Sequence, residues 1–225
     1  MSTAASNPTL DQLREAVING DAKAAASLTA DALASGLGPQ FIVDTALIPA
    51  MDEAGRLFDQ GEFFVPELLV ASRALKASQA LITPLLALSG ATSRGKIVIG
   101  TVKGDLHDIG KNLVVALLQG GGFDVVDLGA DVAPESFVAA VCEHGPDLVG
   151  LSALLTTTML QMQQTIRALG DAGVRERVKV IVGGAPVTER FARECGADGY
   201  ADNAPAAVAL ARSLVAAARY TASAG

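Results

Sequence analysis

The sequence predicts two parts of different class: an N-terminal four-helix bundle, followed by an α/β domain with a five-stranded parallel sheet. Apolar residues recur at helical spacing over residues 8–88, with no alternating strand pattern. From residue 96 onward, short β-branched runs alternate with helical windows. The small, polar stretch SGATSRG separates the two patterns and is the predicted linker. The expected boundaries are therefore 1–88, 89–95 and 96–225.

The N-terminal part is expected to contain four helices. Pro39 and Pro66 each suit the first position of a helix, and Gly61 suits the position after the end of one. The alanine-rich stretch 21–35 supplies the second helix, and the first precedes it from residue 8. Because the connections are short, the four helices are expected to pack antiparallel as a bundle.

The second part contains five strand–helix pairs. Each strand is a continuous apolar run, which is typical of a parallel sheet covered by helices on both faces. The expected strands are 96–102, 123–129, 146–152, 178–184 and 197–202, and the expected helices are 110–121, 134–144, 158–173, 188–195 and 204–218. Ligands of such sheets bind at the carboxyl ends of the strands. His107, Ser152 and Gly183–Gly184 each follow a strand, so we expect them along one edge of the domain.

Composition excludes several classes of function. The net charge of −7 and the absence of Lys/Arg runs argue against nucleic acid or an anionic membrane as a partner. No apolar run approaches the roughly 20 residues that span a bilayer, and the N-terminus lacks the features of a signal peptide. Cys142 and Cys195 are isolated and are expected to be reduced thiols. We therefore expect a cytoplasmic protein.

The stretch TVKGDLHDIGKNLV, residues 101–114, contains one of the two histidines of the chain. Asp105 stands two residues before His107, where a carboxylate can hold one imidazole nitrogen through the other's N–H. That arrangement fixes the tautomer and is typical of metal-binding histidines. Gly110 opens the following helix and permits close approach of something bulky.

The loop by itself leaves other interpretations open. A phosphate loop is disfavoured, because neither the G-x-x-x-x-G-K-[ST] nor the G-x-G-x-x-G spacing is met. A structural zinc site is disfavoured, because His107, Cys142, His144 and Cys195 are scattered without metal-ligand spacing. His107 as a helix-capping or surface residue stays a simple alternative. Likewise, Ser152 and the GGAPV stretch can be an ordinary strand end and turn.

Taken together, Asp105-x-His107-x-x-Gly110, Ser152-x-Leu154 and Gly183–Gly184 resemble the cobalamin-binding domain shared by methionine synthase and the corrinoid proteins of methyltransferase systems. The resemblance implies a flavodoxin-like (Rossmann-like) sheet domain and cobalamin as cofactor, either methylcobalamin or another corrinoid. His107 would be the lower axial ligand of cobalt, replacing the cofactor's own dimethylbenzimidazole in the base-off, His-on state.

The resemblance also implies roles for the other motif residues. Asp105 would hydrogen-bond His107, and Thr158 would complete a His–Asp–hydroxyl relay at a position where family members often have Ser. The nucleotide tail would enter a slot beside the sheet, where Ser152 contacts the base and Gly183 and Gly184 leave room. His107, Asp105 and Thr158 are the residues expected to act in the chemistry. The cofactor contacts expected in this domain are Asp105, His107, Asp108, Ile109, Gly110, Ser152, Leu154, Thr156, Thr158, Gly183 and Gly184.

The helical part resembles the same family. LFDQGEFFVPELLVASRALK, residues 57–76, is similar to its cap module, a helix bundle that covers the upper face of the cofactor. Phe58 and Val65 fall where the family places apolar residues against the methyl group, and Leu68 is their expected neighbour. Alternatively, the phenylalanines of this stretch belong to the core of the bundle.

The resemblance implies a free-standing corrinoid protein, a methyl-carrying component rather than a complete enzyme. Its expected partners are a substrate-specific methyltransferase, a second methyltransferase that passes the methyl group to tetrahydrofolate or a thiol such as coenzyme M, and a reductive activase. GLSALLTTTM, residues 150–159, is especially similar to the corrinoid proteins of methylamine systems. Trimethylamine, dimethylamine, glycine betaine, methanol and aryl methyl ethers all remain possible donors.

Two alternatives share parts of this pattern. A cobalamin-dependent regulator has a similar cap, but such regulators usually carry a DNA-binding domain, for which no basic helix is visible. The small subunit of a cobalamin-dependent mutase shares the D-x-H-x-x-G loop but lacks the cap bundle that GEFFVPELL indicates.

Overall fold

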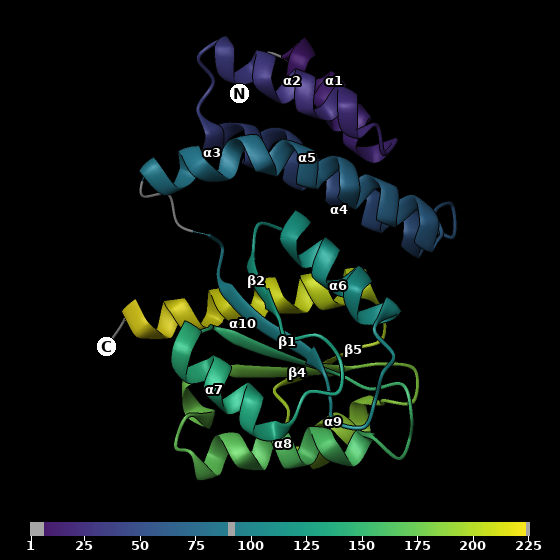
Figure 1. Cartoon of the computed structure of the whole chain (residues 1–225), viewed down its shortest axis with the longest axis vertical. Helices are drawn as coiled ribbons and strands as arrows, with labels where there is room; N and C mark the ends of the chain where they lie inside the picture. The colour runs from purple at the N-terminus through teal and green to yellow at the C-terminus, as the bar shows by residue number, and fades with distance from the viewer. Residues whose placement is uncertain (1–6, 90–92, 224–225) are drawn as a thin grey trace. The chain divides into compact units, whose positions relative to one another are not determined.

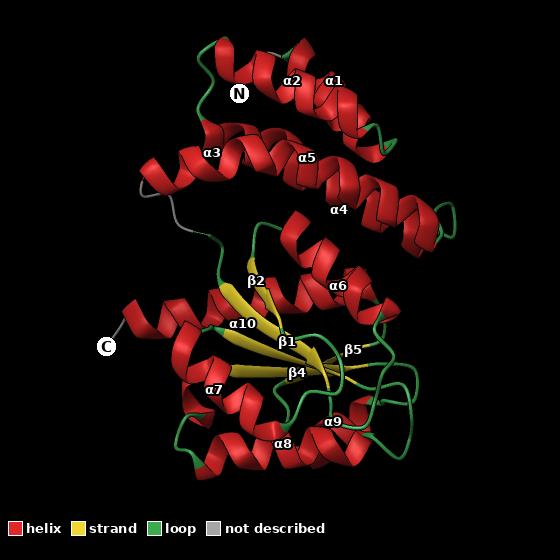
Figure 2. Cartoon of the chain, in the orientation of Figure 1, coloured by secondary structure: helices red, strands yellow, loops and turns green. Residues whose placement is uncertain are grey.

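The computed structural model describes residues 7–89 and 93–223 of the chain. These residues form two compact units, one of helices alone and one with a central sheet, as Figure 1 and Figure 2 show. The sheet unit begins at Ser93, within the stretch predicted as the linker. Ser89 is the last residue of a helix, and residues 90–92 of that stretch lie outside the described residues.

The helical unit confirms the predicted helical half. Its helices are α1 (Pro8–Ile18), α2 (Ala22–Ala34), α3 (Pro39–Ile42), α4 (Ile48–Asp59) and α5 (Val65–Ser89). The side chains of Asn7 and Asp21 cap α1 and α2 by accepting backbone N–H groups of their first turns. The predicted helix that begins at Pro39 is present, but it is divided into α3 and α4.

A π-helical turn, η1 (Val43–Leu47), joins α3 to α4. Ile48 donates its backbone N–H to the carbonyl of Val43, five residues earlier. Pro49 follows and has no N–H to offer to the carbonyl of Thr45, four residues before it. Nη2 of Arg14, in α1, donates to that carbonyl instead at 2.9 Å. A side chain thus supplies the hydrogen bond that the backbone lacks.

The sheet unit confirms the predicted five-stranded parallel sheet. Its strands are β1 (Lys96–Thr101), β2 (Asp124–Asp127), β3 (Leu148–Ser152), β4 (Lys179–Gly183) and β5 (Gly199–Ala201). They pair in the order β2-β1-β3-β4-β5, and all pairs are parallel. This is the flavodoxin-like order, and the strand order reverses between β1 and β3.

Helices cover both faces of this sheet, which explains its continuous apolar strands. Figure 2 shows α6 (Ile109–Gly120) and α10 (Ala204–Ser223) on one face, and α7 (Pro134–His144), α8 (Met159–Asp171) and α9 (Glu189–Cys195) on the other. A 3-10 turn, η2 (Arg175–Arg177), precedes β4. Valines of the central strands pack against Phe137 of α7 and Met162 of α8, both fully buried. None of the described helices is long and apolar enough to cross a membrane.

Candidate functional site

Three strands end at one level of the sheet edge. Thr101 at the end of β1 pairs in register with Ser152 at the end of β3, and Ser152 pairs with Gly183 at the end of β4. The loops that follow these strands therefore start side by side. The sequence placed its candidate residues in these three loops, and the register brings the loops together.

Asp105, in the loop after β1, is completely buried and surrounded by hydrogen-bond donors. Its Oδ1 accepts the backbone N–H of His107 at 3.1 Å and lies 2.8 Å from Nδ1 of the same residue. Its Oδ2 accepts the backbone N–H of Leu154 at 2.7 Å and the hydroxyl of Thr158 at 2.7 Å. The N–H of Leu155 adds a longer contact at 3.3 Å. Both oxygens are thus saturated by the loop after β1 and the loop after β3.

These hydrogen-bond donors determine the ionisation state of Asp105. Burial by itself raises the pKa of the carboxyl, but the hydrogen bonds from Thr158, Leu154 and His107 outweigh it and hold the pKa well below its usual value. The carboxylate is therefore ionised at neutral pH and can only accept hydrogen bonds. Nδ1 of His107 must then carry the hydrogen that they share, so in the neutral imidazole Nε2 is the nitrogen with a free lone pair.

His107 presents this lone pair outward. Its side chain is 51% exposed, although the carboxylate behind it is buried. The hydroxyl of Thr101 donates to the His107 carbonyl at 3.1 Å and so fixes the backbone of the residue as well. Within the described part of the chain, Nε2 has no hydrogen-bond partner. A neutral imidazole that is oriented by a carboxylate in this way is well suited to bind a metal ion.

Large apolar side chains stand exposed around this histidine. Leu106 is 76% and Ile109 is 72% exposed on either side of it in the chain, and Leu154 and Leu155 are 43% and 41% exposed in the loop whose N–H groups bind Asp105. Exposed apolar groups gathered around one polar group are typical of a ligand site. The residues present therefore fit a large apolar ligand that brings its own metal ion and leaves one coordination position for Nε2.

The glycines at this edge have different surroundings. A Cβ at Gly110 would meet no atom within 4 Å, so the space beside it is open. Gly184 has φ +128°, and a Cβ there would lie 1.9 Å from the carbonyl oxygen of Ala153. A Cβ at Gly183 would lie 2.9 Å from the carbonyl oxygen of Ala201. The chain's own backbone thus requires Gly184, and room for a nucleotide tail beside it stays a prediction.

The other predicted residues of the sheet unit lie in the same loops. Ser152 is half-buried at the end of β3, and Thr156 is exposed in the loop that follows. Asp108 is exposed and accepts a hydrogen bond from Nδ2 of Asn112 at 3.1 Å. Within the described residues, no contact of Ser152 or Thr156 favours one ligand over another, so their roles stay predictions.

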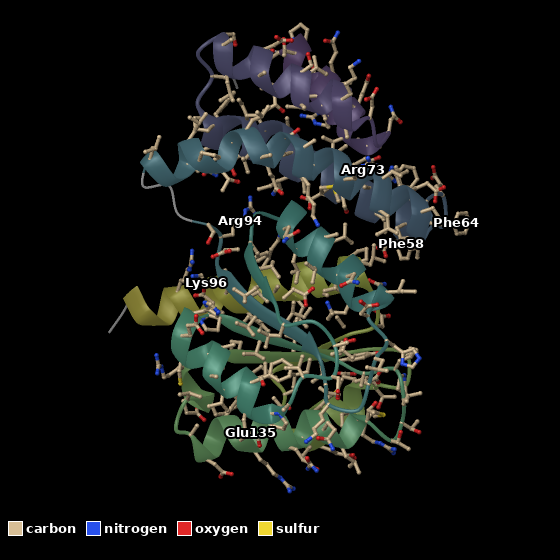
Figure 3. The ribbon with its side chains drawn as sticks, viewed as in Figure 1. Phe58, Phe64, Arg73, Arg94, Lys96 and Glu135 are labelled. Carbon is tan, nitrogen blue, oxygen red and sulfur yellow. The ribbon has the colours of Figure 1, made fainter. Side chains whose placement is uncertain are left out.

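The predicted residues of the helical unit lie near its α4–α5 turn. Figure 3 shows Phe58 and Phe64 at this turn. Phe58 and Val65 are half-buried, Leu68 is fully buried, and Phe64 is 64% exposed. The contact of Phe58, Val65 and Leu68 with a ligand of the sheet unit stays a prediction.

Sequence reasoning missed two residues that hold this edge together. Lys111 is buried, and its Nζ lies 2.6 and 2.7 Å from the carboxylate oxygens of Asp127 at the end of β2. Asp131, in the loop after β2, accepts the backbone N–H of Gly104 at 2.7 Å. The sequence did contain a signal for Asp131. Because β2 ends at the same sheet edge as its parallel neighbour β1, polar residues that follow β2 are also candidates for this edge.

Comparison with known proteins gives two family matches. Residues 9–82 and residues 95–209 each match a family model described as a B12 binding domain. Together the two matches cover both units of the chain.

Known relatives match over nearly the full length. The corrinoid protein DSY3155 of Desulfitobacterium hafniense is 40% identical, covering 92% of this chain and 97% of the relative. Dimethylamine corrinoid protein 1 of Methanosarcina acetivorans is 44% identical over the same shares. The solved methanol:cobalamin methyltransferase complex MtaBC from Methanosarcina barkeri contains a chain with a TM-score of 0.83 and 30% identity, covering 94% of this chain and 81% of that one.

Proposed function

This chain belongs to the corrinoid proteins built from B12-binding domains, and on that basis we propose that it carries methyl groups, on bound cobalamin, between two methyltransferases. The relative in Methanosarcina acetivorans is named for dimethylamine, and the solved complex is a methanol:cobalamin methyltransferase. These names support a place in methylamine or methanol methyltransferase systems.

One structural observation carries this proposal. The ionised Asp105 holds Nδ1–H of His107 and leaves Nε2 free at the exposed edge of the sheet. Nε2 would bind cobalt from below in the base-off, His-on state, and Asp105 would keep the imidazole in the ligating tautomer. Thr158 would hold Asp105, and the exposed leucines and Ile109 would contact the corrin ring.

The remaining parts of the proposal concern chemistry and partners. Bound cobalamin supplies a cobalt ion that accepts a methyl group in its reduced state and releases it to a nucleophile. A substrate-specific methyltransferase would load the carrier, a second methyltransferase would pass the methyl group to tetrahydrofolate or a thiol, and a reductive activase would restore inactivated protein. We place these steps in the cytoplasm, where the free thiols of Cys142 and Cys195 stay reduced.

The lower ligand can be identified by isotope labelling. Protein labelled throughout with heavy nitrogen, which has spin one-half, is reconstituted with unlabelled cobalamin and reduced to the Co(II) form. If Nε2 of His107 binds cobalt, the axial nitrogen splits the electron paramagnetic resonance lines into pairs. The cofactor's own benzimidazole, which carries ordinary nitrogen, would split the same lines into triplets instead.

The two histidines provide a matched control. We expect His107→Ala to lose the paired splitting and His144→Ala, in the second histidine, to keep it. Triplet splitting in the labelled wild type would mean that the benzimidazole remains bound, and the base-off, His-on proposal would be wrong. Transfer itself is tested by incubating methylated protein with candidate methyltransferases and acceptors, where loss of the methyl group is expected.

A further inference from the structure

Asp131 has a backbone conformation that is uncommon outside glycine. Its φ of +56° lies in the left-handed region, and among the described residues every other positive φ belongs to a glycine. Aspartate and asparagine adopt this conformation more readily than other non-glycine residues, and local hydrogen bonds stabilise them in it. The hydrogen bonds of Asp131 therefore show what stabilises this conformation.

Its hydrogen bonds are made to peptide groups on both sides of Asp105. The side-chain Oδ1 of Asp131 accepts the N–H of Gly104 at 2.7 Å, and the backbone N–H of Asp131 donates to the carbonyl of Asp105 at 3.0 Å. One residue thus binds the loop after β1 on both sides of the Asp105 nitrogen. The left-handed conformation lets side chain and backbone reach the same short segment.

Asp131 is itself held by the sheet. The carbonyl of Gly129 accepts the N–H of Thr101 at 2.9 Å, and Val132 donates its N–H to the Thr101 carbonyl at 3.0 Å. An isolated parallel bridge pairs Val132 with Val102. The segment on both sides of Asp131 therefore continues the pairing of β2 with β1, so its position is fixed by the sheet.

We propose that Asp131 is a positioning residue that sets where Asp105, and through it Nε2 of His107, lies at the sheet edge. This inference rests on the proposed function, since it concerns the ligand of cobalt. Among the described residues, Asp131 makes no hydrogen bond to the imidazole of His107. It acts through the backbone of Gly104 and Asp105, and Asp105 acts on Nδ1 of His107.

Three substitutions separate the hydrogen bond from the backbone conformation. Asp131→Asn keeps an oxygen that accepts from Gly104, and asparagine tolerates a left-handed φ. Asp131→Gly removes the acceptor but relieves the strain, so this variant is expected to fold. Asp131→Ala removes the acceptor and keeps the strain. Asp124→Ala, at the opposite end of β2 beside Lys96, is the matched control away from this edge.

The first measurement uses protein without cofactor. Amide hydrogen exchange of Gly104, followed by nuclear magnetic resonance, is expected to become about tenfold faster in Asp131→Gly and Asp131→Ala, because the side-chain acceptor of this N–H is lost. Asp131→Asn and Asp124→Ala are expected to stay near the wild type. Wild-type exchange at Gly104 in Asp131→Gly would overturn the inference.

The second measurement uses the labelled, cobalamin-loaded protein. The fraction of Co(II) that shows paired nitrogen splitting is expected to fall at least by half in Asp131→Gly and Asp131→Ala, and to be restored in Asp131→Asn. An unchanged fraction in the glycine variant would also overturn the inference. Absence of paired splitting in the wild type would instead contradict the proposed function. The failure of this inference and the failure of the proposed function are therefore distinguishable.

Discussion

At Gly184 an added methyl group would lie 1.9 Å from the carbonyl oxygen of Ala153, whereas at Gly110 it would meet no atom within 4 Å. Gly184 also has a positive φ, and Gly110 lies in the first turn of α6. The first glycine is therefore needed by the fold. The second has no such need within the chain, and alanine favours a helix more than glycine does.

This difference predicts opposite effects of two identical substitutions. Gly184→Ala is expected to destabilise the cofactor-free protein by at least about 3 kcal/mol, because both the backbone conformation and the contact with Ala153 must change. Gly110→Ala is expected to stabilise it by up to about 1 kcal/mol, yet to weaken cobalamin binding at least about tenfold. Urea unfolding measures the first quantity, and absorbance titration with cobalamin measures the second. Equal cobalamin affinity of Gly110→Ala and wild type would mean that the open space is not used by the cofactor.

The Asp105 site shows which residue contacts a sequence can predict. The hydrogen bond to His107 follows from a spacing of two residues and was expected. The contacts with Leu154 and Thr158 join residues 49 and 53 positions apart, and they depend on the register of β1 with β3. The resemblance indicated a hydroxyl at Thr158. The backbone donors carry no side-chain signal, so they were missed.

At the scale of elements, the π-helical turn between α3 and α4 depends on one side chain from another helix. Arg14 donates to the carbonyl of Thr45, and Pro49 cannot. We expect Arg14→Met to cost about 1–2 kcal/mol of unfolding free energy, because a carbonyl loses its charged donor. In a Pro49→Ala background the cost is expected to shrink by about 1 kcal/mol, since the new backbone N–H can donate to Thr45. Chemical denaturation of the four proteins measures this coupling.

A control distinguishes that contact from the surface ion pair of the same residue. Arg14 also lies 3.6 Å from Asp11, and both side chains are partly exposed. Asp11→Asn is expected to cost less than about 1 kcal/mol, as exposed ion pairs usually do. Equal costs of Arg14→Met with and without Pro49 would contradict the link between the proline and the π turn.

The elements themselves were largely predictable, and the exceptions have physical reasons. Continuous apolar runs and helical spacing located all five strands and the helices between them, because burial on both faces leaves a strong pattern. The π turn Val43–Leu47 was missed because one inserted residue hardly disturbs that spacing. The role of the loop after β2 was missed because Asp131 acts through backbone groups that no motif records.

At the scale of the whole molecule, each unit has its own match to a B12-binding model, and the two units carry different kinds of side chain. The sheet unit holds the residues proposed to bind cobalt from below. The helical unit has no such polar cluster among its predicted residues, and instead presents aromatic and aliphatic side chains near the α4–α5 turn (Figure 3). The contact of these side chains with the cofactor stays a prediction; if it is made, an apolar cover would exclude water from the reactive face and keep photolysis fragments together long enough to recombine.

A substitution of Phe58 tests the predicted apolar cover. We expect Phe58→Ala to speed photolysis of bound methylcobalamin, because removal of this half-buried ring near the end of α4 would open the predicted apolar cover. Phe41→Ala is the matched control, since Phe41 is 52% exposed on α3, away from the α4–α5 turn, and its loss is expected to leave the rate unchanged. The decay of the methylcobalamin absorbance under constant light gives both rates. Equal rates in Phe58→Ala and wild type would remove Phe58 from the cover, whereas faster decay in both variants would indicate a general loosening of the helical unit.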